Sequence, residues 1–178
     1  IYVARNPFDC VVSFYHHTRG FAQHYDFSTG SFEDYFESFL AGEVDFGDYF
    51  DNLASWYEHR DDPNVYFLTY ETLKADVRPA VVEIAEFLEL PCGGDEATLD
   101  EVVRHSSLAN MRKGQGRWSS RRPKDSPAFI RKGVVGDWLN YFSPDQAHRL
   151  ADKFRASAEK SGFGRLWPDI VEAARQMS

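Results

Sequence analysis

The sequence predicts an α/β fold, in which helices pack against a parallel β-sheet. A short apolar run at residues 1–4 leads directly into a helix start, and a second apolar run at residues 65–70 follows two helical patterns. Amphipathic helical spacing covers most of the remaining chain. Strands separated by helices are typical of parallel sheets, so we expect one domain over residues 1–178.

The first strand is expected to be buried, because all of its side chains are apolar or aromatic. A central strand needs a neighbour on each side, so we also expect further sequence before it. The strand ends at Arg5, where Asn6 offers an N-cap, Pro7 fits the first helical position and Asp9 lies three residues after the cap. Four side chains of this helix should face the core: Cys10, Val11, Phe14 and Tyr15.

Caps and spacing predict the later elements. Ser31 opens a helix with Asp34 in the capping-box position, and Ser143 opens a long one with Pro at its first position. Between them we expect a helix around residues 50–57, a strand at 65–70, and helices at 79–90 and 95–104. Residues 112–128 lack periodicity and contain Gly and Pro, so we expect a long loop of the kind that often carries function.

The net charge of −8 argues against general binding to nucleic acid. The charge is uneven, however, because residues 112–132 hold eight cations and one acid. This segment is either a solvated basic loop or a site for a small polyanion.

Two cysteines, Cys10 and Cys92, form no pattern typical of disulfides or of a metal site, so we expect a reducing, cytoplasmic compartment and no metal. The adjacent His16 and His17 would point in different directions on a helix, which also argues against a shared metal. No apolar run approaches the roughly 18 residues that a membrane span needs, so no membrane partner is expected.

Two charged strings are the strongest functional signals. In Tyr2-Val3-Ala4-Arg5-Asn6-Pro7, the planar guanidinium at the strand's end can fork onto a phosphate, although a surface ion pair is the alternative. The basic run, residues 131–138, reads Arg-Lys-Gly-Val-Val-Gly-Asp-Trp. Cations beside glycines suit an anion, because a residue without Cβ lets backbone N–H groups approach closely.

These strings, in this order, resemble the cytosolic sulfotransferase family, whose members transfer a sulfuryl group from 3'-phosphoadenosine 5'-phosphosulfate (PAPS) to a phenol, alcohol or amine. The resemblance runs from residue 1 to about residue 165 and corresponds to roughly the C-terminal three-fifths of a family member. It implies a P-loop-NTPase-like three-layer fold with a central parallel sheet, present here as a single partial sulfotransferase domain. It also implies an enzyme acting on a small acceptor such as a phenol, steroid or catecholamine.

The resemblance assigns residues to the coenzyme and the acceptor. Arg5 and Ser13 would hold the 3'-phosphate from one side, and Arg131, Lys132 and Gly133 from the other. Residues matched to the adenine contacts are Tyr70, Ser106, Ser107, Leu108 and Met111, with Leu108 standing where an aromatic residue is usual. Phe14 and His17 match acceptor-pocket positions. Asp137 and Trp138 would order the basic run and anchor it in the core.

The resemblance also implies what is missing. The family's catalytic His and 5'-phosphosulfate loop would fall before Ile1, so this chain offers no catalytic residue and is expected to be inactive alone. The reaction needs no metal and leaves adenosine 3',5'-bisphosphate as product. Positions of the family's dimer motif hold other residues, which leaves the oligomeric state open: Leu139, Ser143, Pro144 and His148.

Two other functions stay open on the sequence alone. One is a non-catalytic nucleotide-binding or interaction protein descended from the same fold. The other is a P-loop nucleoside or nucleotide kinase, which is less favoured because such enzymes need no 3'-phosphate clamp.

Overall fold

A computed structural model describes residues 1–91, 95–114, 117 and 128–178. Within them, β1 (Tyr2–Ala4) and β2 (Phe67–Thr69) form a parallel two-stranded sheet, with Val3 opposite Leu68. The expected α/β architecture with a parallel sheet is therefore confirmed.

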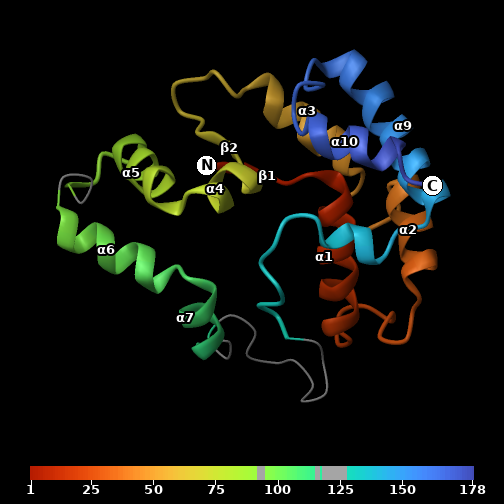
Figure 1. Ribbon diagram of the computed structural model, residues 1–178, viewed down its shortest axis with the longest axis horizontal. Coiled ribbons are helices and arrows are strands. Elements are labelled where there is room, and N and C mark those ends of the chain that lie inside the picture. Colours follow the sequence, from red (N-terminus) through yellow and green to blue (C-terminus); the bar gives the residue numbers. More distant parts are fainter. Residues whose placement is uncertain (92–94, 115–116, 118–127) are drawn as a thin grey trace.

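The helices form two groups, a body on one side of the sheet and an arm on the other (Figure 1). The body of the molecule contains α1 (Pro7–Gly20), α2 (Phe32–Ala41), α3 (Tyr49–Glu58), the 3-10 helix η2 (Asp137–Asn140), α9 (Pro144–Ser161) and α10 (Pro168–Arg175). After β2 the chain forms α4 (Tyr70–Ala75) and then an arm of three helices, α5 (Val77–Phe87), α6 (Glu96–His105) and α7 (Leu108–Lys113). The described part of the chain returns from the arm to the body through the basic run, which lies beside α1 (Figure 1).

Helix α1 begins as the sequence predicts, but its buried face differs in part. The Asn6 side chain accepts a hydrogen bond from the Asp9 amide at 2.8 Å. Val11 and Tyr15 are buried, whereas Cys10 and Phe14 are only half-buried. Phe8 is fully buried instead, because its ring packs against Trp138 with the centroids 5.0 Å apart. The deepest face of α1 is therefore the one turned toward η2.

The prediction of a fully buried first strand is wrong at Val3, which is 47% exposed, whereas the neighbouring Ala4 is buried. Successive side chains of a strand point to opposite faces, and the described residues cover only one face of β1 at this position. Strand β2 is shorter than predicted, because the Thr69 side chain caps α4 and makes Tyr70 the first residue of that helix.

The N-caps explain which helix starts agree with the prediction and which do not. Ser31 and Ser143 cap α2 and α9 as expected, and Ser143 and Gln146 form a reciprocal capping box. Helix α5 starts two residues earlier than predicted, because Asp76 is its cap and a proline is tolerated within the first turn. It ends at Phe87, three residues short of the predicted end.

Among the described residues, the sequence does not predict three α-helices, α4, α7 and α10, or the 3-10 helix η2. Residues 112–113 end α7, and most of the predicted loop at 112–128 lies outside the described residues, as does Cys92. Cys10 is a free thiol. None of the described helices combines the length and the apolar composition that crossing a bilayer requires.

Candidate functional site

Arg5 lies at the centre of the predicted coenzyme residues. Its Nη2 donates to the Val134 carbonyl at 3.1 Å, and its guanidinium lies over the Tyr70 ring, 4.4 Å from the centroid. Arg5 Nε is buried and has no hydrogen-bond partner among the residues that the structure describes. One side chain thus connects the strand end, the predicted adenine residue and the basic run.

Within the basic run, Asp137 holds both predicted phosphate-binding cations. Its two carboxylate oxygens accept from Arg131 Nη1 at 2.5 Å and from Lys132 Nζ at 2.6 Å, and Asn140 donates to the same group. Burial would raise the pKa of this carboxyl, but hydrogen bonds from Lys132, Arg131 and Asn140 outweigh it and hold the pKa below its ordinary value. Asp137 therefore stays charged and orders the two cations.

Asp9 attaches the basic run to α1. Its Oδ2 accepts from the Gly136 amide at 2.8 Å and its Oδ1 from the Trp138 amide at 3.0 Å. The Asp9 side chain is fully buried, and Arg5 Nη2 lies 4.0 Å from Oδ2. Trp138 is also buried, in agreement with its expected anchoring role. The contact of Asp9 with Gly136 spans 127 positions and has no local sequence signal, so the sequence predicts Asp9 only as part of a helix cap.

Ser13 and Arg131, predicted on opposite sides of one phosphate, line the same small cavity of about 180 Å³. His16 and His17 also line it, because residues three and four positions after Ser13 share its face of α1. Nε2 of His16 lies 2.8 Å from the Tyr141 hydroxyl. Burial, and then the nearby Arg131, lower the pKa of His16 to about 4, so this imidazole is neutral at pH 7. The sequence alone does not predict His16 as a residue of the site.

The predicted adenine residues of α7 are held against the basic run. Gly133 has a φ of +65°, and a Cβ at that position would lie 3.0 Å from Leu108 Cδ1. Arg112 on α7 donates to the carbonyl of Arg131. Ser107 caps α7, whereas Ser106 and Met111 line a second cavity of about 640 Å³ that the arm forms with its own residues.

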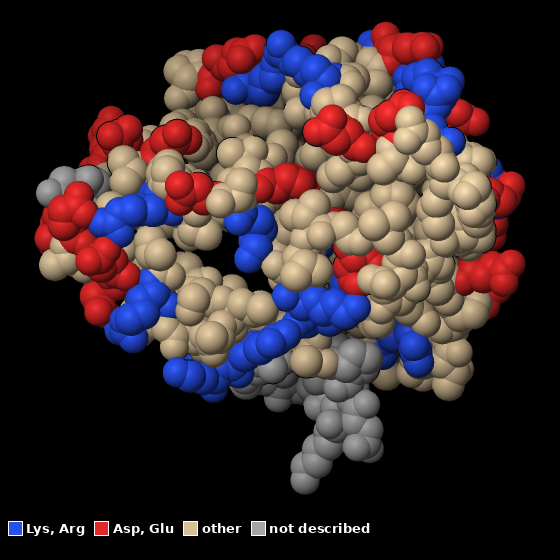
Figure 2. All heavy atoms as spheres, viewed as in Figure 1, with Lys and Arg blue, Asp and Glu red and all other residues tan. Residues whose placement is uncertain are grey.

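Figure 2 shows Lys and Arg side chains gathered around an opening between the arm and the body. Of the predicted residues, Ser13, His17 and Arg131 line one cavity, and Ser106 and Met111 line the other.

The two predicted acceptor residues lie on α1 among aromatic rings. Phe14 packs against Tyr35 and Phe46, with centroids 5.9 and 6.3 Å away. The His17 ring lies 4.5 Å from that of Phe21. His17 lines the cavity that Ser13 and Arg131 share, but Phe14 does not.

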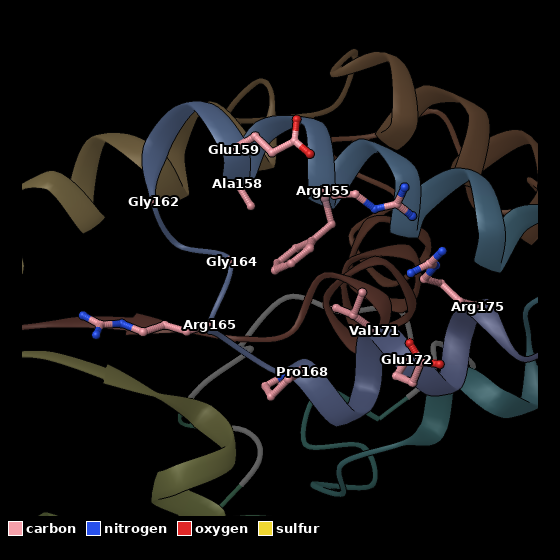
Figure 3. Close-up of a pocket in the computed structure, with 11 residues that line it drawn as sticks. Arg155, Ala158, Glu159, Gly162, Gly164, Arg165, Pro168, Val171, Glu172 and Arg175 are labelled. Carbon is pink, nitrogen blue, oxygen red and sulfur yellow. The ribbon is translucent and has the colours of Figure 1, made fainter.

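A further cavity, of about 510 Å³, lies between α9 and α10 and contains none of the predicted residues (Figure 3). Phe154, Ala158 and Val171 contribute its apolar lining, and Arg155 and Arg175 lie at one end. Among the residues that the structure describes, no group of three or more His, Cys, Asp or Glu could hold a metal ion.

Fold and site together define an α/β protein with a cationic site where a parallel strand meets a helix N-terminus. Comparison with known proteins gives the family: residues 1–162 match the family model described as the sulfotransferase domain. The chain is 37% identical over 165 residues to Sulfotransferase 1C2 of Oryctolagus cuniculus, covering 89% of this chain and 54% of the relative. It is 38% identical over 160 residues to Sulfotransferase 2B1 of Mus musculus, covering 87% and 46%. The chain therefore belongs to the sulfotransferase family.

Solved structures agree. The crystal structure of mouse sulfotransferase SULT7A1 complexed with PAP superimposes with a TM-score of 0.81 at 32% identity, covering 97% of this chain and 61% of that one. Retinol dehydratase in complex with androsterone and inactive cofactor PAP has a TM-score of 0.82 at 24% identity, a likeness of fold alone. The chain spans about half the length of the curated relatives that it matches.

Proposed function

We propose that this chain is the coenzyme-binding part of a PAPS-dependent sulfotransferase. The observation that carries the proposal is the meeting of two cationic segments: Arg5 bonds to Val134, 129 positions away, and Asp9 fixes the same run through Gly136. Arg5 and Ser13 would hold the 3'-phosphate on one side, with Arg131, Lys132 and Gly133 on the other. Adenine would be held by Tyr70, Ser106, Ser107, Leu108 and Met111.

Three features of the site fit a phosphate-bearing coenzyme. Arg5 Nε is a buried donor with no acceptor in the described part of the chain, and a buried donor gains most from a charged partner. Gly133 has a left-handed φ of +65°, and because glycine has no Cβ, its backbone can approach a phosphate closely. His16 stays neutral beside Arg131, so the positive charge that Arg131 brings to the cavity does not depend on protonation of His16. When bound, PAPS would supply the sulfuryl group and leave adenosine 3',5'-bisphosphate.

The role of this chain would be to bind and orient. Its cations would fix the 3'-phosphate, the feature that separates PAPS from ordinary nucleotides, and so select the coenzyme. The base and the 5'-phosphate cradle would be supplied by sequence outside these residues, so the chain alone would be inactive. Phe14 and His17, within their aromatic surroundings, would form part of a pocket for a small phenol, alcohol, steroid, catecholamine or other amine.

The proposal also covers the cellular compartment of the protein and its binding partners. We place it in the cytoplasm as a single partial sulfotransferase domain that needs no metal and binds neither nucleic acid nor membrane. These statements rest on the family resemblance, the acidic net charge and the cysteine pattern.

Transfer of labelled sulfuryl from PAPS tests this function. The full-length protein is incubated with phenols, catecholamines, steroids and simple alcohols, and labelled product is measured. Transfer to one of these classes is the expected result and identifies the acceptor. Tight binding of adenosine 3',5'-bisphosphate without any transfer would favour the non-catalytic alternative, and failure to bind it would contradict both.

A further inference from the structure

The segment after residue 162 lies beyond the family match, yet one of its side chains reaches the network beneath the candidate site. Trp167 Nε1 donates to Glu71 Oε2 at 2.6 Å. The indole is 8% exposed and packs against Phe154, with ring centroids 6.3 Å apart. A residue outside the matched family region thus contacts a carboxylate that immediately follows Tyr70.

Glu71 links Trp167 to the candidate site, because it also accepts hydrogen bonds from Asn6. Its other oxygen, Oε1, accepts from the Asn6 amide at 3.0 Å and from Asn6 Nδ2 at 2.6 Å. Asn6 is fully buried, and its Nδ2 also donates to Asp9 Oδ2 at 3.0 Å. Asp9 in turn holds the Gly136 amide. The members of this network adjoin the candidate coenzyme residues, since Glu71 follows Tyr70 and Asn6 follows Arg5.

The backbone at Trp167 is unusual. Its φ of +54° and ψ of 44° lie in the left-handed region, which is unfavourable for a residue with a bulky side chain. Such a conformation persists only where the surroundings over-determine it. Here the buried indole and its hydrogen bond to Glu71 hold the residue in place, and α10 begins at the next residue.

We propose that Trp167 is a positioning residue of the coenzyme site. By donating to one oxygen of Glu71, it fixes the carboxylate so that the other oxygen holds both donors of Asn6. Asn6 then sets the backbone beside Arg5 and one oxygen of Asp9. This inference rests on the proposed function, because the ligand that reports it is the coenzyme product.

Trp167→Phe tests the proposal, because it keeps an aromatic ring and removes the N–H donor. Affinity for adenosine 3',5'-bisphosphate is measured by titration calorimetry on the full-length protein. We expect affinity to fall about three- to tenfold, in the lower part of the range of coupling within one hydrogen-bond network. Phe36→Leu is the matched control: Phe36 is fully buried in α2, packs against Phe142 and has no hydrogen-bonding group with which to join the network. It should lower the melting temperature and leave the affinity unchanged.

A second comparison distinguishes a positioning role of Trp167 from a general loss of rigidity of the protein. In a Glu71→Gln background, Trp167→Phe should cost little further affinity, since the contact through which it acts is already altered. If the wild-type protein prefers bisphosphate and Trp167→Phe binds it equally well, the inference is wrong. An equal loss of affinity in Phe36→Leu would also overturn it. If the wild-type protein shows no preference for bisphosphate over adenosine 5'-monophosphate, the proposed function fails instead.

Discussion

At the scale of single residues, two buried carboxylates organise the cations of the site. Burying a carboxylate is costly unless donors surround it. Asp9 receives two backbone N–H groups and Asn6, whereas Asp137 receives Arg131, Lys132 and Asn140. Because these bonds hold the cations and the backbone in position, less order must be imposed when an anion binds.

Arg131 should contribute directly to anion binding. One charge-assisted contact contributes about 1.5–3 kcal/mol, so Arg131→Ala should weaken bisphosphate binding by about tenfold or more. Calorimetric titration measures the change. Arg155→Ala is the control, since Arg155 pairs with Asp152 on α9 and lines a different cavity. Unchanged affinity in Arg131→Ala would remove that residue from the site.

His16 should make folding sensitive to mild acid. Its pKa is lowered to about 4, whereas an unfolded histidine titrates near 6.5. The unfolded chain therefore binds this proton first, and stability falls as the pH drops from about 6.5 toward 4. Arg131, Arg19 and Lys132 oppose protonation of the folded imidazole, and Asp137 favours it.

Urea unfolding of the wild type and of His16→Gln checks this prediction. At pH 8 the imidazole is neutral in both states, and the difference in unfolding free energy between the two proteins serves as the reference. At pH 5 that difference should shift in favour of the variant. Parallel pH profiles would show that His16 is not the responsible group.

At the scale of elements, the basic run depends on how closely α7 packs against it. Gly133 and Gly136 both have positive φ, but a Cβ at Gly133 would meet Leu108 at 3.0 Å, whereas a Cβ at Gly136 would have no atom of the described residues within 4 Å. Comparing substitutions at the two glycines therefore distinguishes the cost of backbone strain from the cost of disturbing the contact with α7.

Substituting each glycine by alanine tests this packing. Gly136→Ala should cost about 1 kcal/mol of unfolding free energy through left-handed strain alone. Gly133→Ala should cost more and should also weaken bisphosphate binding, because Leu108 must move. Chemical denaturation measures the two free energies. Equal costs would mean that α7 does not rest on the run in solution.

Local signals explain which elements the sequence predicts. The caps at Ser31 and Ser143 are read directly, because each satisfies backbone donors a few residues away. Helix α10 escapes prediction because its N-cap, Trp167, makes no side-chain cap bond. The exposure of Val3 depends on what lies over a sheet face, which strand composition does not record.

At the scale of the whole molecule, the candidate site joins segments that are far apart in sequence. Each of the two sequence strings that contain Arg5 and Arg131 can be recognised by itself, so the candidate residues could be predicted from the sequence. The way in which these segments come together could not be predicted, because it depends on the contact of Asp9 with Gly136 and on Glu71, which links Asn6 to Trp167. These contacts join the strand end, the basic run and the C-terminal segment.

The central claim is that Arg5 and Arg131 close around one ribose-attached phosphate. The most direct test is the ratio of the affinities for adenosine 3',5'-bisphosphate and adenosine 5'-monophosphate, measured on the full-length protein and on its Arg5→Ala and Arg131→Ala variants. We expect a large ratio for the wild type and a ratio reduced toward one in each variant, with monophosphate affinity little changed. A wild-type ratio near one, or a ratio that neither substitution alters, would contradict the claim.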